Sequence, residues 1–396
     1  MTARRICVIS YEYPPTGGYF GGIGTQYGAL APCWAAAGAE VHVVTARPPG
    51  KEVAPVIDGV HVHALTPARG LPWVAATWAR RVRGAMRDLG PFDAVICPEF
   101  RGEASLYSDR QAEGPLVTHL LTSTAQLLAL RPGLTAAERH GPRTRIFQSL
   151  ERRQAERSQA LFSAGEAVLQ WARRLWPSID GVPARILPLT IRVGEVRKLA
   201  ADGELPPGFP APGRRPLVAL ASRLDGHKGA DALLEAMRQV WISHPDAQLV
   251  YIGRDSRYQG GAMSEHLRGL AGEHAGRMHF TGALPGSQYF AAVAACDVVA
   301  IPSLWESFCL AAVEAMALGV PVIGTRGHGF DEYLRDRENG LLVERRDVDA
   351  LAEAVERLLD SPELRSALGA AAQLTADELD VPRVAPRYLQ AFSAII

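Results

Sequence analysis

The chain has 396 residues, of which 47% are hydrophobic and 21% are charged, and its net charge is zero. This is an ordinary globular composition, the length favours two domains, and no apolar stretch reaches the roughly 18 uncharged residues that a membrane span needs. The five cysteines form no CxxC pair, which predicts reduced thiols in a cytoplasmic protein and no metal site.

The first half of the chain alternates short apolar strands with helical segments. A strand over 6–9 begins directly after Arg4 and Arg5, without the apolar core of a signal peptide. A loop rich in proline and glycine follows, and the next helix is predicted to run from about Thr25 to Ala37, with Gly38 as its C-cap. Further strands are predicted at 41–44, 60–65, 94–97 and 116–118. This alternation predicts a parallel sheet covered by helices on both faces.

The loop at 11–28 contains a possible phosphate contact. Gly22 and Gly24 open the following helix, and glycine there allows the backbone to approach a phosphate closely. A dinucleotide fingerprint would need a further glycine where Tyr27 stands, and an acidic residue within 45–47, where the chain has Thr-Ala-Arg. Binding of NAD is therefore disfavoured. The alternative is a plain turn.

The first half also carries excess positive charge. Residues 1–200 contain 24 Lys and Arg against 16 Asp and Glu, a difference of +8, and the remainder balances this with −8. Segment 73–90 includes Arg80, Arg81, Arg83 and Arg87 beside apolar residues. It could lie on an anionic membrane as a peripheral contact, but a helix packed on its own sheet with arginines outside is the more common arrangement.

A segment at 192–215, rich in proline, glycine and charge, is the predicted linker between two domains. Alternation then restarts with strands at 217–220, 248–252, 298–301 and 320–323, and a helix at 348–359. The predicted fold is therefore α/β, with two Rossmann-like doubly wound domains facing a cleft. In such sheets ligands bind beyond the carboxyl ends of the strands. The predicted domains are 1–191 and 216–379.

Two cations follow the strand at 217–220. Arg223 and Lys228 flank a turn just before the helix that begins near Gly229. An Arg fork, a Lys point charge and the free N–H groups of a helix N-terminus together suit a diphosphate. The alternative is two exposed basic residues in a turn.

Two glutamates follow the strand at 298–301. Glu306 is expected just before a helix starting near Ser307 or Phe308, and Glu314 eight residues further, about 12 Å along that helix. A carboxylate can accept both hydroxyls of a vicinal diol. Glu306 could hold hexose hydroxyls and Glu314 a ribose diol, while phosphate or sugar oxygens face the N–H groups of Phe308, Cys309 and Leu310. The alternatives are a loop carboxylate at Glu306 and an ion pair with an arginine at Glu314.

These motifs resemble the retaining family 4 glycosyltransferases, which have the two-domain GT-B fold. The segment "RLDGHKGADALLEAM", the Glu306/Glu314 pair and "MALGVPVIGTRGHGFDEYL" match in order and spacing. The likeness covers nearly the whole chain, strongly over 216–343 and loosely before it. It implies that residues 380–396 cross back to the first, acceptor-binding domain.

The resemblance also implies roles for individual residues. Arg223 and Lys228 would bind the donor diphosphate, Glu306 the sugar and Glu314 the ribose. Leu284 would contact the nucleobase, Gly22 the donor phosphates, and His119, at the end of a strand and facing the cleft, would lie beside the reacting carbon. Two departures stand out: Cys309 replaces a usual glycine, and Leu189-Thr190-Ile191-Arg192 replaces an Asn-Gly-Val-Asp-like turn.

The implied activity is retaining, metal-independent transfer of a hexose from a nucleotide diphosphate sugar to a hydroxyl of a small-molecule, glycan or lipid-linked acceptor. UDP is the expected nucleotide, and GDP and ADP remain as alternatives. We expect no cofactor and no nucleic-acid partner. Asp347-Val348-Asp349 resembles a metal-binding Asp-x-Asp, but its place before a helix predicts a cap. A sugar-nucleotide epimerase and a non-catalytic nucleotide-sugar binding protein remain as alternatives.

Overall fold

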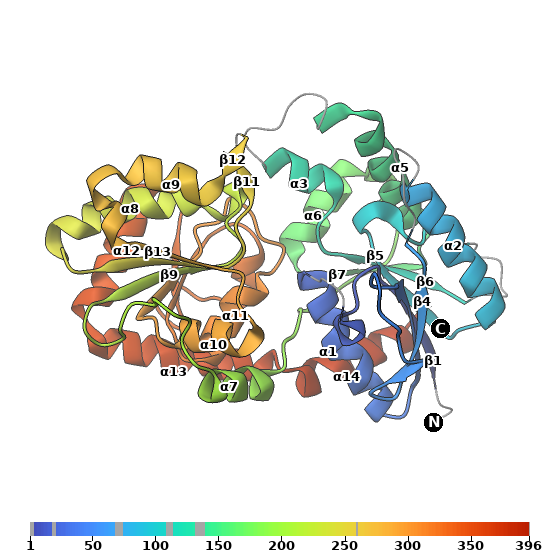
Figure 1. Ribbon diagram of the computed structural model, residues 1–396. Coiled ribbons are helices and arrows are strands. Elements are labelled where there is room, and N and C mark those ends of the chain that lie inside the picture. The colour runs from blue at the N-terminus through green and yellow to red at the C-terminus, as the bar shows by residue number, and fades with distance from the viewer. Residues whose placement is uncertain are drawn as a thin grey trace. The chain divides into compact units, whose positions relative to one another are not determined.

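A computed structural model describes residues 4–17, 21–67, 74–107, 114–130, 139–258 and 260–395. The chain divides into two compact units (Figure 1). Unit 1 comprises Met1–Ala129, Leu134–Thr190 and Val381–Ile396, and unit 2 comprises Leu130–Gly133 and Ile191–Asp380. Each unit is an α/β domain built on its own sheet. The predicted fold class, two α/β domains with parallel sheets, is confirmed.

Unit 1 has an eight-stranded sheet in the order β3-β4-β2-β1-β5-β6-β7-β8. Every described pair is parallel except β3 with β4. The strands are β1 (Arg5–Ile9), β2 (Glu40–Ala46), β3 (Val56–Ile57), β4 (Val60–Leu65), β5 (Ala94–Pro98), β6 (Leu116–Leu120), β7 (Ala160–Ser163) and β8 (Ala184–Ile186).

Helices cover both faces of this sheet, because successive side chains of a strand point to opposite sides. Ile6 and Val8 face the core beneath α1 and α14, whereas Cys7 and Ile9 face the core beneath α2. The helices in the described part of unit 1 are α1 (Gly22–Ala36), α2 (Val74–Leu89), α3 (Thr124–Leu130), α5 (Pro142–Glu156), α6 (Glu166–Leu175) and α14 (Val381–Ser393), with 3-10 turns η1 (Pro14–Thr16), η2 (Phe100–Gly102) and η3 (Pro177–Ile179).

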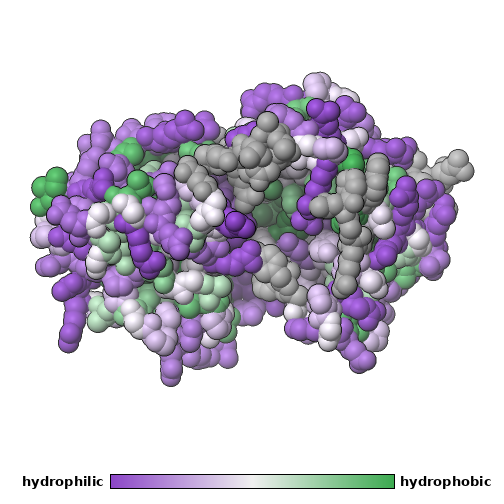
Figure 2. All heavy atoms as spheres, turned by 45° about the horizontal axis from the view of Figure 1, so that its top comes forward, coloured by the Kyte–Doolittle hydropathy of each residue, from purple (hydrophilic) through white to green (hydrophobic). Residues whose placement is uncertain are grey.

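The α2 helix has one apolar face and one basic face. Trp78, Val82 and Met86 are buried against the sheet, and Arg80, Arg81 and Arg87 are exposed. Of the two arrangements predicted for segment 73–90, the structure has the helix packed on its own sheet with arginines outside. None of the helices in the described ranges is long and apolar enough to cross a membrane. On the face drawn in Figure 2, hydrophilic residues predominate and hydrophobic ones are scattered in small separate areas.

The last helix, α14, belongs to unit 1 although it follows unit 2 in the chain. The indole Nε1 of Trp34 on α1 donates a hydrogen bond to the carbonyl of Ala385 at 3.1 Å. Tyr388 and Phe392 are fully buried in the same core as Trp34. The core on this face of unit 1 is therefore assembled from both ends of the sequence.

Unit 2 has a six-stranded sheet in the order β13-β10-β9-β14-β15-β16, and all its described pairs are parallel. The strands are β9 (Leu217–Ala221), β10 (Gln248–Ile252), β13 (Met278–Gly282), β14 (Val298–Ala300), β15 (Val322–Thr325) and β16 (Leu341–Val343), and β11 (Arg257–Tyr258) pairs with β12 (Gly261–Ala262) as a separate ribbon. The strand order reverses between β9 and β14, so the ligand crevice of this sheet is expected at the carboxyl ends of those two strands.

The helices of unit 2 are α7 (Val193–Asp202), α8 (Ala230–Ser243), α9 (Met263–Ala271), α10 (Gly286–Ala294), α11 (Leu310–Ala317), α12 (Val348–Asp360) and α13 (Pro362–Glu378), with 3-10 turns η4 (Gly226–Lys228), η5 (Gly272–Arg277) and η6 (Gly329–Glu332). Asp347 caps α12, because its Oδ1 accepts the N–H of Ala350 at 2.9 Å. The predicted cap at Asp347 is confirmed.

The first half of the predicted linker at 192–215 is helical and belongs to unit 2. Residues 193–202 form α7, whose Arg197 Nε donates to the carbonyl of Ala317 at 2.9 Å and whose Arg197 Nη1 lies 2.9 Å from Asp377 Oδ1. Val193 and Val196 are buried. The charged composition that indicated a linker belongs to a surface helix of unit 2, which has two buried valines and is bonded to its neighbours through Arg197.

Candidate functional site

The carboxyl end of β9 leads into a turn that holds two cations. Arg223 is exposed, and its guanidinium Nη2 lies 3.6 Å from Asp225 Oδ2, while Lys228 ends η4. Gly229 then has φ +74°, a left-handed conformation that favours glycine, and a Cβ there would come 2.1 Å from the carbonyl oxygen of Pro302. Glycine therefore allows this turn to pack directly on the segment that follows β14.

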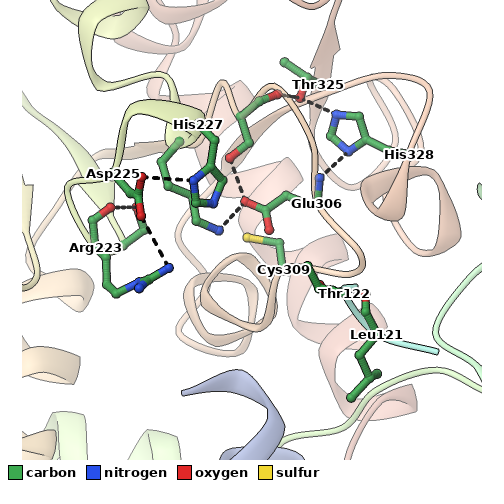
Figure 3. Close-up of polar contacts among 12 residues, drawn as sticks. Leu121, Thr122, Arg223, Asp225, His227, Glu306, Cys309, Thr325 and His328 are labelled. Atoms are coloured by element: carbon green, nitrogen blue, oxygen red, sulfur yellow. Dashed lines mark hydrogen bonds and ion pairs between the residues drawn. The ribbon is translucent and has the colours of Figure 1, made fainter. Parts of the chain in front are cut away.

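That packing brings Lys228 to Glu306. Lys228 Nζ donates to Glu306 Oε1 at 2.6 Å, and Ser303 Oγ donates to the same oxygen at 2.6 Å (Figure 3). Both ionic side chains are mostly buried, with 15% and 8% of their surface exposed. Burial opposes the charge on Glu306, but Lys228, His227 and the hydrogen bonds outweigh it and lower the pKa of Glu306. Burial likewise opposes the charge on Lys228, but Glu306 outweighs it and raises the pKa of Lys228. The pair is ionised at neutral pH, so Glu306 is a charged acceptor and not a proton donor.

The turn after Glu306 differs from the predicted one. The helix was expected to start near Ser307 or Phe308, but α11 begins at Leu310 with Cys309 as its N-cap. Cys309 has φ 74° and ψ 78°, and no residue with a positive φ can lie inside a right-handed helix. A left-handed conformation costs a non-glycine residue roughly 1–2 kcal/mol. The glycine usual at this place in the resembling family would remove that strain.

The residues that precede and follow Cys309 differ in what they can present to a ligand. The ring of Phe308 is fully buried against Tyr333, with ring centroids 4.9 Å apart, so its side chain belongs to the core. The hydroxyl of Tyr333 donates to the carbonyl of Cys309 at 3.2 Å. Leu310 is half-buried at the first position of α11. The first N–H groups of a helix have no acceptor within it, so the backbone here remains suited to phosphate or sugar oxygens.

Glu314 lies one turn into α11 and is half-buried. The hydroxyl of Tyr289, on α10, donates to Glu314 Oε2 at 3.0 Å. Burial raises the pKa of Glu314 to about 7, against the opposing effect of this hydrogen bond. Across the described residues, no basic side chain lies within ion-pair distance of Glu314. The alternative of an ion pair with an arginine is therefore not observed, and only residues 310–314 of the Glu306–Glu314 span are helical.

Leu284 occupies the turn between β13 and α10 and is half-buried. The helix that follows it carries Tyr289, the hydrogen-bond partner of Glu314. Leu284 therefore lies in the turn that leads into the helix contacting Glu314, and its role at a nucleobase stays a prediction.

His119 lies near the carboxyl end of β6 as predicted, but its side chain belongs to the core of unit 1, and its place beside the reacting carbon stays a prediction. His119 lies inside β6 and is fully buried, with Nδ1 3.2 Å from the hydroxyl of Tyr27 and Nε2 3.3 Å from the hydroxyl of Tyr388. Burial lowers the pKa of His119 to about 3. Side chains of a strand alternate, so His119 shares a face with Val117, which belongs to the core beneath α1 and α14. Both ring nitrogens are engaged by the core of unit 1.

Gly22 is the first residue of α1 and is exposed. The preceding Gly21 donates its N–H to Glu12 Oε2 at 2.7 Å, which holds the start of the helix. Residues 18–20 of the same loop lie outside the described residues. The contact of Gly22 with donor phosphates stays a prediction.

Several residues of the site carry no sequence signal of their own. Ser303 and Tyr289 hold the two glutamates, and His328 and Thr325 bond to each other and to the segment 303–306. Ser303 lies in the same loop as Glu306, but Tyr289, Thr325 and His328 come from other elements of unit 2, and their contacts depend on how β14, β15 and α10 pack together. Only the fold brings them to the glutamates.

Two family models match this chain. A model described as "Glycosyl transferases group 1" matches residues 203–375, and one described as "Glycosyl transferase 4-like domain" matches residues 21–190. Unit 2, with Arg223, Lys228 and both glutamates, contains the whole of the first match. The second match lies within 1–190, the continuous first part of the chain.

Two curated relatives match over the full length of this chain, and a third matches over part of it. The chain is 29% identical to the phosphatidyl-myo-inositol mannosyltransferase of Mycobacterium leprae, covering 100% of this chain and 97% of the relative. It is 27% identical to the protein of that name from Mycolicibacterium smegmatis, covering 100% and 94%. A third relative, the GDP-mannose-dependent monoacylated alpha-(1-6)-phosphatidylinositol monomannoside mannosyltransferase of Corynebacterium glutamicum, is 38% identical over 39% of this chain and 41% of its own length.

Solved structures share the fold. A sucrose-phosphate synthase from Thermosynechococcus elongatus superposes with a TM-score of 0.77 at 22% identity, covering 99% of this chain and 100% of that one. The Anabaena protein Alr3699/HepE in complex with UDP-glucose superposes with a TM-score of 0.70 at 18% identity, covering 99% and 100%. At these identities the likeness establishes the two-domain architecture alone.

Proposed function

Since this chain belongs to the family 4 glycosyltransferases of GT-B fold, we propose that it transfers mannose from GDP-mannose to a hydroxyl of an inositol-containing phospholipid, with retention of the anomeric configuration. The two matching family models indicate that it is a glycosyltransferase. The observation that carries the proposal is the buried Lys228–Glu306 pair beside the exposed Arg223, at the point where the strand order of unit 2 reverses. A cation pair and a charged acceptor at one point suit a diphosphate and the sugar attached to it.

GDP-mannose replaces the UDP-sugar expected from the sequence. The support comes from the relatives, because the protein from Corynebacterium glutamicum is named as GDP-mannose-dependent and the full-length relatives are named as mannosyltransferases. The acceptor is proposed on the same ground, since the full-length relatives act on phosphatidyl-myo-inositol by name. The exposed arginines of α2 would attract anionic lipid headgroups to unit 1.

The proposed step is a substitution on one face of the sugar. The acceptor oxygen bonds to the anomeric carbon as the bond from that carbon to the β-phosphate oxygen breaks. The acceptor proton passes to the departing phosphate. Arg223 and Lys228 would stabilise the charge that develops on the diphosphate, and electrostatic stabilisation of this kind usually contributes most to the rate enhancement. Ionised Glu306 would accept sugar hydroxyls. No residue of this chain takes the proton in this scheme.

A donor and acceptor screen tests the proposed function. We expect GDP-mannose to raise the Tm more than UDP-glucose, UDP-N-acetylglucosamine or ADP-glucose, and radiolabelled mannose to move to lipid only when vesicles contain phosphatidylinositol. Vesicles of phosphatidylcholine alone serve as the control. Stabilisation by UDP-sugars alone would overturn the donor. Conversion of the donor to an epimer without acceptor would indicate the isomerase, and binding without turnover the non-catalytic protein.

Metal chelation should leave the activity unchanged. Arg223 and Lys228 would supply the positive charge that a divalent cation supplies in other transferases. We expect the initial rate of transfer in excess EDTA to equal that in buffer alone. A rate that falls on chelation and returns with added Mg²⁺ or Mn²⁺ would contradict the assignment of these two cations.

A further inference from the structure

Glu306 is held in a closed ring of four residues from two segments of unit 2, residues 303–306 and residues 325–328. Ser303 Oγ donates to Glu306 Oε1 at 2.6 Å, and the backbone N–H of Glu306 donates to His328 Nδ1 at 3.2 Å. His328 Nε2 lies 2.9 Å from Thr325 Oγ1, whose hydroxyl donates to the carbonyl of Ser303 at 2.7 Å. The ring therefore fixes both the backbone and the carboxylate of Glu306 (Figure 3).

The donors in this ring determine the protonation of His328. Its Nδ1 faces an N–H and must be an unprotonated acceptor. The single proton of the Thr325 hydroxyl goes to Ser303, so Thr325 Oγ1 accepts from His328 and Nε2 carries the ring proton. Only the neutral Nε2–H tautomer satisfies every contact. Burial lowers the pKa of His328 to about 4, and nearby Arg345 and Lys228 also oppose a ring charge, against Glu306 and Asp331.

The loop that carries His328 packs closely against the backbone of Glu306. His328 is 1% exposed, and its ring lies 5.6 Å from that of Trp305 and 5.6 Å from that of Phe330. The adjacent Gly329 donates its N–H to the carbonyl of Glu306 at 3.0 Å. A Cβ on Gly329 would come 2.4 Å from the carbonyl carbon of Ser307, so only glycine allows this approach.

We infer that His328 is a positioning residue for the transfer reaction, which acts through the backbone N–H of Glu306 to aim the Glu306 carboxylate at the donor sugar. The inference rests on the proposed role of Glu306. Removal of the Nδ1 acceptor would loosen the backbone at 306, which would keep the hydrogen bond from Gly329, while leaving the diphosphate contacts of Arg223 and Lys228 in place. The effect should therefore fall on turnover of the intact donor and not on binding of the free nucleotide.

A pair of amide substitutions separates this role from packing. The amide of Asn reaches the position of Nδ1, so His328→Asn keeps an acceptor for the N–H of Glu306. The amide of Gln reaches the position of Nε2, so His328→Gln keeps the contact to Thr325 and loses that acceptor. We expect His328→Gln to lower kcat about 10- to 100-fold, because a misplaced group costs about that much, and His328→Asn to stay within about 5-fold. The Kd of GDP should change less than about twofold in both.

His279 provides the matched control. It is half-buried on β13, where its Nε2 lies 3.0 Å from Gln248 Oε1, and it contacts none of the four ring residues. The same two substitutions there should leave kcat unchanged. Equal kcat in His328→Asn and His328→Gln, or a lower value for Asn, would overturn the inference, as would a parallel loss of GDP affinity.

A measurement independent of activity distinguishes failure of the inference from failure of the proposed function. In the whole protein labelled with ¹⁵N-histidine, the signal that disappears in His328→Asn should have the shifts of a neutral ring protonated at Nε2. A ring protonated at Nδ1 would overturn the inference even if mannose is transferred. If the wild-type protein transfers no sugar but shows the Nε2–H ring, the proposed function fails and the ring geometry stands.

Discussion

Arg223→Ala should lower kcat by about 100- to 1,000-fold, the usual cost of removing one group that stabilises developing charge. Arg223 is exposed, and its ion-pair partner in the described structure is Asp225, at 3.6 Å, so the free energy of unfolding should change by less than about 0.5 kcal/mol. Turnover is measured with saturating donor and stability by urea unfolding. Lys198→Ala, on the exposed surface of α7, is the control and should behave as wild type.

Lys228→Ala should lower kcat at least as much and should also destabilise the fold. Its partner Glu306 is buried, and removing one member of a buried ion pair costs about 3–5 kcal/mol. The double variant Lys228→Met with Glu306→Gln removes both charges and should recover most of that stability without activity. Wild-type turnover in either single variant would show that these cations do not bind the leaving diphosphate.

Glu314→Gln and Glu306→Gln should fail in different ways. Glu314→Gln should weaken GDP binding by about 1.5–3 kcal/mol, about 10- to 150-fold, because a charged acceptor is lost against two ribose hydroxyls. Glu306→Gln should bind GDP as tightly as wild type or tighter, because Lys228 loses its competing carboxylate, yet should depress turnover of GDP-mannose. Calorimetric titration of both variants with GDP separates the cases.

The pH dependence of GDP binding should identify Glu314 further. Burial raises its pKa to about 7, so below pH 7 the carboxyl is protonated and loses acceptor strength. GDP affinity should therefore fall as the pH drops through 7 in the wild type, more steeply than in Glu314→Gln, in which only the phosphate itself titrates. Equal loss of GDP affinity in Glu306→Gln and Glu314→Gln, or parallel pH profiles, would contradict both assignments.

The sequence was informative where local pattern determines structure. Apolar runs located β1, β2, β5, β9 and β10 within one or two residues, and the cap at Asp347 followed from its place before a helix. Strands β7 (160–163), β13 (278–282) and β16 (341–343) were missed, because periodicity alone does not distinguish a short apolar run of a strand from a buried part of a helix. Alternation along β6 could have placed His119 on the same face as Val117, inside the core.

The site was predictable only as far as its motif extends. Arg223, Lys228 and Glu306 follow neighbouring strands, and the carboxyl ends of neighbouring parallel strands meet at one edge of a sheet. The groups that set their charge and direction come from elsewhere: Tyr289 is on α10, and His328 is in a loop after β15. Such contacts depend on the packing of segments that are distant in the sequence, and the spacing of residues does not predict that packing. The left-handed turn at Cys309 was likewise hidden, because it is occupied by a residue that disfavours it.

The position of α14 sets an order in which the units can be completed during translation. The core beneath α1 needs Tyr388 and Phe392, yet residues 1–190 leave the ribosome first and unit 2 is made in between. At 5–20 residues per second, roughly 10–40 seconds pass between the synthesis of residue 190 and that of α14. Over that interval Trp34 and the surrounding apolar face of unit 1 lack their cover, while unit 2, apart from Leu130–Gly133, is continuous and can close as soon as Asp380 emerges. We therefore expect the nascent first unit to expose more apolar surface during synthesis than unit 2 does.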